Sequence, residues 1–159
     1  CNNNNLASVT FADNGSLTSI GSSAFKATAI SGVEIPATVT TLGSSVFENC
    51  SNLTDVVFKG NAINTIDTAA FANTAIQSIV IPDSVTTIKS GAFQDCTALT
   101  EVKLSSNLKT LATISSSKTT ANKGSVFEGC TSLEYIDLPD SLTYMGTFTF
   151  RNSGLKKTL

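Results

Sequence analysis

Apolar side chains recur along this chain in three columns with a period close to 23 residues. The clearest column is phenylalanine, with spacings of 22, 24, 22, 34 and 23 residues: Phe25, Phe47, Phe71, Phe93, Phe127 and Phe150. A second column stands five residues earlier, except in the fifth repeat: Ile20, Leu42, Ile66, Ile88, Leu111 and Met145. A third column opens each repeat: Leu6, Ile30, Leu53, Ile76, Leu99, Leu133 and Leu155. Three columns in step predict a solenoid of stacked coils.

Each repeat also contains a short alternation of apolar and polar residues. The apolar pairs are Val33/Ile35, Val56/Phe58, Ile79/Ile81, Val102/Leu104 and Ile136/Leu138. A period of two predicts one short strand per coil with one buried face, and stacked coils make these strands one continuous parallel sheet. Pro36, Pro82 and Pro139 follow the strands, where a missing amide donor ends the pairing at little cost.

The predicted architecture is a single solenoid domain over residues 1–159. Its coils are right-handed, with one strand each and with turns, irregular segments or short β and 3-10 segments on the other side. The repeats cover residues 6–29, 30–52, 53–75, 76–98, 99–132 and 133–154, with a partial repeat at 155–159. Gly21, Gly43 and Gly146 follow the second column, which indicates tight turns with unusual dihedral angles.

Composition excludes several classes of function. The net charge is -2 and the sequence pI is about 5.0, and no basic stripe is present, so nucleic acid is not an expected partner. The chain has no His, which removes the commonest general base and metal ligand. We therefore expect no enzymatic activity, no cofactor and no metal site. No apolar run reaches the roughly 18 residues that suggest a transmembrane segment.

Residues 30–50 and 76–96 carry the most complete repeats, and both resemble a known family. IPATVTTLGSSVFENC and IPDSVTTIKSGAFQDC are similar to BspA-like leucine-rich repeats, whose pattern is roughly LxxIxIPxxVTxIGxxAFxxCxxL. The resemblance covers about residues 6–155. Departures from the pattern are Lys59 and Ser105 for the proline, Lys89 for the turn glycine, Thr28, Thr74 and Ser153 for the cysteine, and one insertion.

This resemblance implies a leucine-rich-repeat solenoid in a secreted or cell-surface protein of bacteria or certain parasitic protists. It further implies adhesion, through a protein or glycan ligand on host matrix or on neighbouring cells. A structural spacer or stalk within a larger surface protein or lipoprotein is the alternative.

The outward residues of the predicted strands form the candidate binding face, because packing leaves these side chains free for recognition. The candidate ligand-binding residues are Glu34, Asp55, Val57, Val80, Glu101, Lys103, Tyr135 and Asp137. Val57, Val80 and Tyr135 are the most suggestive, since apolar and aromatic groups facing water often mark contacts. Asp55 and Glu101 lie two coils apart with no pocket implied around them, so a catalytic carboxylate pair is not expected.

The cysteines and the insertion leave alternatives open. Cys50, Cys96 and Cys130 stand three residues after a column Phe, which favours buried free thiols over a disulfide or a metal site. Cys1 is either the end of a preceding coil or the lipid anchor of a mature lipoprotein. The insertion at about 112–123 is either a functional loop or a neutral excursion.

Overall fold

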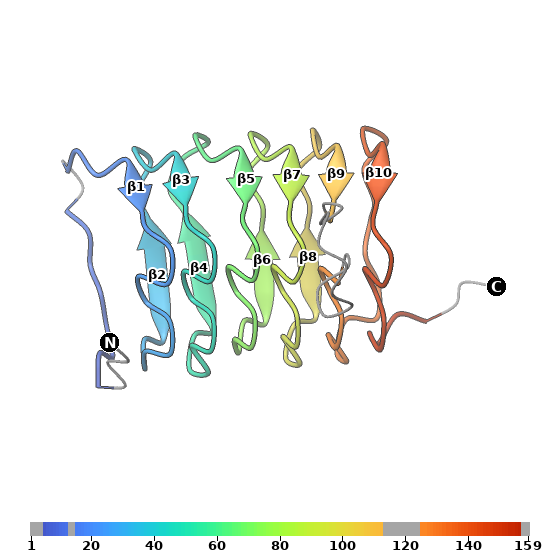
Figure 1. Cartoon of the computed structure of the whole chain (residues 1–159), viewed down its shortest axis with the longest axis horizontal. Coiled ribbons are helices and arrows are strands. Elements are labelled where there is room, and N and C mark those ends of the chain that lie inside the picture. Colours follow the sequence, from blue (N-terminus) through green and yellow to red (C-terminus); the bar gives the residue numbers. More distant parts are fainter. Residues whose placement is uncertain (1–4, 13–14, 113–124, 157–159) are drawn as a thin grey trace.

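The computed structural model describes residues 5–12, 15–112 and 125–156, and these residues stack as successive coils along a straight axis (Figure 1). We number the coils 1 to 6 by their column phenylalanines, Phe25 to Phe150. The described residues contain strands and turns but no helix. Every strand pairing is parallel, as a β-solenoid with about 23 residues per coil requires. The predicted fold class is therefore confirmed, while the outer limits of each repeat stay predictions.

Two rows of strands run along the stack. The first row holds the strands that the sequence predicted: β2 (Gly32–Ile35), β4 (Asp55–Phe58), β6 (Ser78–Val80) and β8 (Glu101–Lys103). The second row holds two-residue strands that contain the second apolar column: β1 (Ser19–Ile20), β3 (Thr41–Leu42), β5 (Thr65–Ile66), β7 (Thr87–Ile88), β9 (Thr110–Leu111) and β10 (Tyr144–Met145). A third side carries the column phenylalanines in tight turns.

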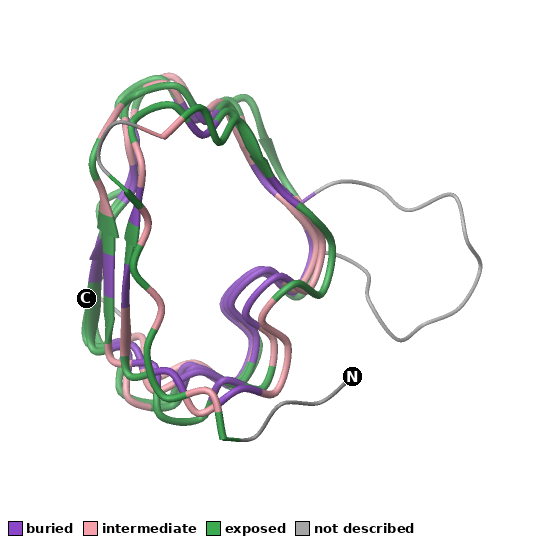
Figure 2. Cartoon of the chain, turned by 90° about the vertical axis from the view of Figure 1, so that its left-hand side faces the viewer, coloured by how far each residue is buried: buried purple, intermediate pink, exposed green. Residues whose placement is uncertain are grey.

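The column phenylalanines form the spine of the core. Consecutive rings from Phe25 to Phe150 lie nearly parallel, with centroids 5.4 to 5.7 Å apart. The four middle rings, Phe47 to Phe127, are fully buried. Seen along the axis, the coils superimpose and the buried positions of successive coils coincide (Figure 2). Equal sequence positions therefore meet equal environments, which is why the repeat could be read from the sequence.

Backbone hydrogen bonds on the phenylalanine side continue through all six coils. The amide of each column Phe from Phe25 to Phe127 donates to a carbonyl of the next coil, as in Phe47 N–H to Ala70 O at 2.8 Å and Phe71 N–H to Ala92 O at 2.8 Å. In coils 1 to 4 and 6 the residues two places before and after the column Phe adopt left-handed dihedrals, for example Ala69 and Asn73 with φ of 53° and 55°, and in coil 5 the residue two places after it does so. These positions hold mostly Ser, Ala, Gly, Asn or Asp, which suits a conformation that penalises large side chains.

Phe148 departs from that composition. It stands two places before Phe150 with a φ of 65° and is 47% exposed. The guanidinium of Arg151 lies 4.8 Å from its ring centroid. An aromatic residue in the left-handed region is strained, and here no burial compensates the strain.

The three described cysteines are free and buried, as expected. Each thiol donates to the carbonyl of the Phe one coil earlier, at 2.9 Å for Cys50 and 3.1 Å for Cys96 and Cys130. Burial, the largest cause, raises the pKa of the Cys96 and Cys130 thiols, so both stay protonated near neutral pH. The column is thus a set of small hydrogen-bonded core residues. Cys1 lies outside the described residues, as does the insertion apart from Ala112.

The prediction that the glycines after the second column adopt unusual dihedral angles is wrong for Gly21 and Gly43. Gly21 and Gly43 are not in the left-handed region. A Cβ at Gly43 would instead stand 2.3 Å from the backbone nitrogen of Ser22 in the preceding coil, where Gly43 N–H donates to Ile20 O at 2.8 Å. Close approach of two coils, and not a special turn, requires glycine there.

The prediction of one continuous sheet is also wrong. In the first row, β2 pairs only with β4 and β6 only with β8, and no ladder joins β4 to β6. The segments containing Val9 and Ile136 form no strand. Leu138 and Met145, predicted to point inward, are 44% and 48% exposed, because no later described coil covers coil 6.

Proline accounts for the interruptions. In the register of the first row, Pro36 of coil 2 aligns with Lys59 of coil 3, whose amide donates to Ile35 O at 2.9 Å. The same position holds proline in coils 2, 4 and 6, and in the first row no strand ladder joins any of these coils to the coil before it. A proline has no amide hydrogen, and its ring carbon occupies the place of that hydrogen. Alternating prolines therefore divide the row into bonded pairs, coils 2 with 3 and coils 4 with 5.

Candidate binding face

The outward residues of the first row form one exposed surface, which we call the strand face. Parallel register sets Gly32 beside Asp55 and Glu34 beside Val57. It likewise sets Ser78 beside Glu101 and Val80 beside Lys103. All eight candidate residues are exposed: Glu34, Asp55, Val57, Val80, Glu101, Lys103, Tyr135 and Asp137. The predicted placement of these side chains thus agrees with the structure, while their role in binding stays a prediction.

Hollows on the strand face lie where the ladder is interrupted. The first hollow, of about 480 Å³, lies between residues 9–11 of coil 1 and β2 of coil 2, with Asp55, Val57 and Lys59 of coil 3 also lining it. The second, of about 450 Å³, lies between β4 and β6, and the third, of about 480 Å³, between β8 and residues 135–139. Each unbonded junction thus opens a recess, whereas the bonded pairs form the ridges between recesses.

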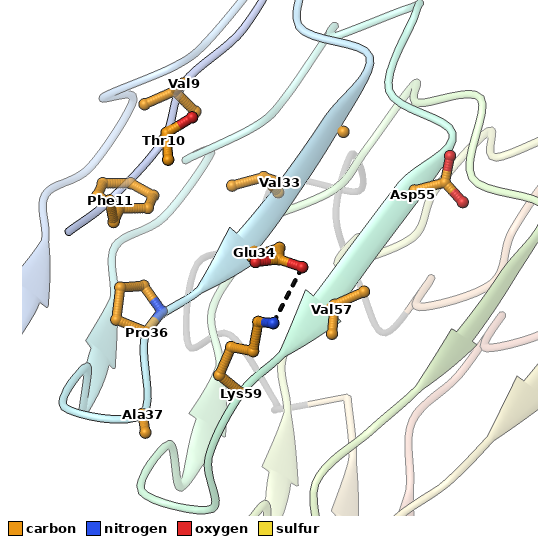
Figure 3. A pocket seen from close by; sticks show the side chains of 11 residues that line it. Val9, Thr10, Phe11, Val33, Glu34, Pro36, Ala37, Asp55, Val57 and Lys59 are labelled. Carbon is orange, nitrogen blue, oxygen red and sulfur yellow. Dashed lines mark ion pairs between the residues drawn. The ribbon is translucent and has the colours of Figure 1, made fainter. Parts of the chain in front are cut away.

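The first hollow contains an ion pair and one further carboxylate, Asp55. Glu34 and Lys59 point toward each other on one side of it, from β2 and from the residue after β4, and their charged atoms are 3.0 Å apart (Figure 3). Val9 and Phe11 stand opposite them. The side chains of the ion pair are 64% and 47% exposed, so its contribution to stability is small.

The second hollow combines apolar and acidic side chains. Val57 and Val80 are 47% and 61% exposed beside it, although both are aliphatic. Asp55 accepts a hydrogen bond from the Thr54 hydroxyl at 2.6 Å. Asp83 accepts from the amide and hydroxyl of Ser106, and these two bonds lower the pKa of its carboxyl group.

The third hollow is lined by an exposed aromatic side chain, Tyr135. Tyr135 is 66% exposed, and its hydroxyl donates to Asp137. That hydrogen bond and the negative charge of Asp137 raise the pKa of Tyr135, because both favour the protonated phenol. Glu101 and Lys103 line the same hollow from β8.

The hollows do not follow from the sequence pattern of a single repeat. Asp55 lines the first and second hollows and Glu101 lines the third, although the sequence implies no pocket around either residue. Phe11, Lys59 and Asp83 were not recognised as neighbours of the candidate residues. The signal was present in the alternation of Pro36, Lys59, Pro82, Ser105 and Pro139, but its effect depends on register between coils.

Within residues 5–12, 15–112 and 125–156, no three His, Cys, Asp or Glu side chains gather closely enough to hold a metal ion. In the same part of the chain, no helix has the length and apolar character needed to cross a membrane.

Comparison with protein families finds six copies of the BspA type leucine rich repeat region, matched over residues 1–100, 64–123 and 107–158. The chain belongs to this family. Leucine-rich repeat solenoids generally serve as non-enzymatic scaffolds that bind proteins through extended faces. Among curated proteins, no significant match is found.

Solved bacterial structures share the fold. A leucine-rich repeat protein from Eubacterium ventriosum is 25% identical with a TM-score of 0.68, over 87% of this chain and 35% of its own. A leucine-rich repeat protein from Bacteroides ovatus is 25% identical with a TM-score of 0.54, over 93% and 48%. A leucine rich cell surface protein from Faecalibacterium prausnitzii is 28% identical with a TM-score of 0.50, over 81% and 41%. The chain spans less than half the length of each.

Proposed function

We propose that this chain is a non-enzymatic binding module of a secreted or cell-surface protein, and that it binds a protein or glycan ligand on host matrix or on neighbouring cells. The family and the similarity to a protein named as a cell surface protein support this location. The strand face is the proposed contact surface.

The observation that carries the proposal is the exposure of Val57, Val80 and Tyr135 around recesses. Aliphatic and aromatic groups that remain 47%, 61% and 66% exposed cost solvation free energy that a bound partner would recover. The strand face owes no stability to these side chains, since the core lies on the opposite surface of the strands. It is therefore free to vary for recognition.

The test is a binding screen against host matrix proteins and glycans, with the wild type and with the triple variant Val57→Lys, Val80→Lys and Tyr135→Ala. We expect the variant to lose affinity at least roughly tenfold, since anchors near the centre of an interface typically contribute 2 kcal/mol or more each. A matched control carries Ser19→Lys, Thr41→Lys and Tyr144→Ala, at exposed positions of the second strand row. Equal binding by both variants and the wild type would remove the strand face from the proposal.

A spacer role is the second candidate, because the uninterrupted ladder on the phenylalanine side makes the stack stiff along its axis. A spacer depends on length alone. If no ligand is found and the full-length protein keeps its activity when these coils are replaced by an unrelated solenoid of equal length, the spacer role is favoured.

A further inference from the structure

We infer that the partner of the strand face is an extended, cationic polypeptide in a polyproline II conformation, lying along the solenoid axis. It places one basic side chain in the second hollow and one in the third. This inference rests on the proposed function, since it names a partner class for the same face.

Charge favours a cationic partner. The second and third hollows are lined by four carboxylates, Asp55, Asp83, Glu101 and Asp137, and by one ammonium group, Lys103. In the part of the chain that the structure describes, none of these carboxylates forms an ion pair within 4.0 Å. The first hollow differs in degree, because Lys59 pairs with Glu34 there and leaves only Asp55 without an ion pair, whereas the second and third hollows each contain two such carboxylates. Unpaired carboxylates attract a basic chain and repel an anionic polysaccharide.

Apolar groups beside those carboxylates match the long basic side chains. Lys and Arg lay their methylene stems on apolar surface and keep the charged end at a polar group. The second hollow offers Val57 and Val80 next to Asp55 and Asp83. The third offers Tyr135 and Leu138 next to Glu101 and Asp137. A small anion or a neutral sugar would leave the carboxylates without a counter-charge.

The spacing of the recesses sets the conformation of the partner. The second and third hollows are two coils apart. Neighbouring strands are about 4.8 Å apart, so two coils span about 10 Å. Stacked rings give a similar coil spacing, 5.4 Å for Phe71 to Phe93 and for Phe93 to Phe127.

A polyproline II chain has three residues per turn and a rise of about 3.1 Å, so one of its faces repeats every roughly 9.3 Å. A β-strand instead presents one face every two residues, at about 6.7 Å, and falls out of step with the hollows. The polyproline II conformation is also already extended before binding, which lowers the entropy lost on association.

The experiment compares two peptides of identical composition by fluorescence anisotropy. In the first, lysine occupies every third position of a proline-rich chain. In the second, the same lysines are spaced irregularly by two and four residues. We expect the first peptide to bind roughly tenfold more tightly at low salt, and the difference to shrink as salt rises.

Variants locate the contact. Asp55→Asn with Asp83→Asn, and Glu101→Gln with Asp137→Asn, should each weaken the first peptide by roughly tenfold. Glu34→Gln should change little, because Lys59 already pairs with Glu34. Asp95→Asn, exposed on the phenylalanine side, is the control for net charge. Circular dichroism checks that each variant is folded.

Equal affinity for both peptides would overturn the inference, as would equal weakening by Asp95→Asn. Binding of an anionic or neutral glycan without binding of the lysine peptides would overturn it too. In each of these cases the proposed function survives if the triple variant at Val57, Val80 and Tyr135 still loses its ligand.

Discussion

The phenylalanine side and the strand face belong to the same coils but differ in how they hold neighbouring coils together. On the phenylalanine side, amide-to-carbonyl bonds join every coil to the next, and the rings between them are buried. On the strand face, only alternate junctions are bonded, and aliphatic side chains such as Val57 and Val80 face water.

This difference separates stability from recognition. A solenoid is stabilised by the sum of its coil interfaces, so one continuous side is enough to hold the stack. The strand face can then carry prolines, hollows and unpaired carboxylates without unfolding the chain. Four predictions test how far that separation holds, from the largest expected effect to the smallest.

Phe71→Ala should destabilise the chain by about 3–5 kcal/mol, because it removes a fully buried ring that stacks on Phe47 and Phe93 at 5.5 and 5.4 Å. Chemical denaturation followed by circular dichroism measures the change. The matched variant on the strand face, Val80→Ala, should cost less than about 0.5 kcal/mol. Similar losses in the two variants would contradict the separation.

Phe148 tests the left-handed positions of the phenylalanine side. Phe148→Asn should be more stable than Phe148→Ala by about 0.5–1 kcal/mol, because asparagine tolerates a φ of 65° better than alanine does. Both variants remove the same contact with Arg151, so their difference isolates the backbone. Melting temperatures measure this difference in stability. An alanine variant that melts at or above the temperature of the asparagine variant would contradict the explanation.

Two carboxylates near the phenylalanine side, Glu48 directly after Phe47 and Asp67 directly after β5, predict a loss of stability in acid. Burial alone would raise the pKa of Glu48 and of Asp67, but hydrogen bonds and the charges of Lys26 and Lys89 outweigh it and lower both pKa values from 4.5 and 3.8. Their stabilisation is therefore complete above those ordinary values and is lost as the pH falls through the lowered ones.

Each pair is partly exposed, so the expected contribution is under about 1 kcal/mol. The double variant Glu48→Gln, Asp67→Asn should lose less stability between pH 7 and pH 3 than the wild type does. Chemical denaturation at the two pH values measures the free energy of unfolding of both proteins. Identical losses would show that these pairs do not act in folding.

Pro82→Ala tests the cause of the interrupted ladder with the smallest effect on global stability. A hydrogen bond from the new amide at position 82 to the carbonyl oxygen of Phe58 should add about 0.5–1.5 kcal/mol of stability. The more flexible unfolded chain should offset about 0.4–1 kcal/mol of that gain. The amide of Val80, which the alternation of a parallel ladder directs toward β4, should exchange its hydrogen more slowly. Asp83→Ala, which keeps Pro82, is the control. Unchanged hydrogen exchange at Val80 in Pro82→Ala would show that the proline does not cause the interrupted ladder.

Repetition determined much of this protein from sequence alone. Because equal positions in successive coils meet equal surroundings, the columns of Phe47, Ile66 and Cys96 could be assigned to the interior, and Val57, Val80 and Tyr135 to the outside. The strands that contain Val33, Val56, Ile79 and Val102 followed from a period of two.

Only the tertiary structure decided what happens between coils. Whether β4 bonds to β6, whether Gly43 touches Ser22, and whether Asp55 and Glu101 border recesses all depend on distances of a few ångströms between segments more than twenty residues apart. Those distances change where one coil has a proline, because the proline has no amide hydrogen to donate to the neighbouring coil. A pattern within one repeat does not contain that information, because the hydrogen bond belongs to two repeats at once.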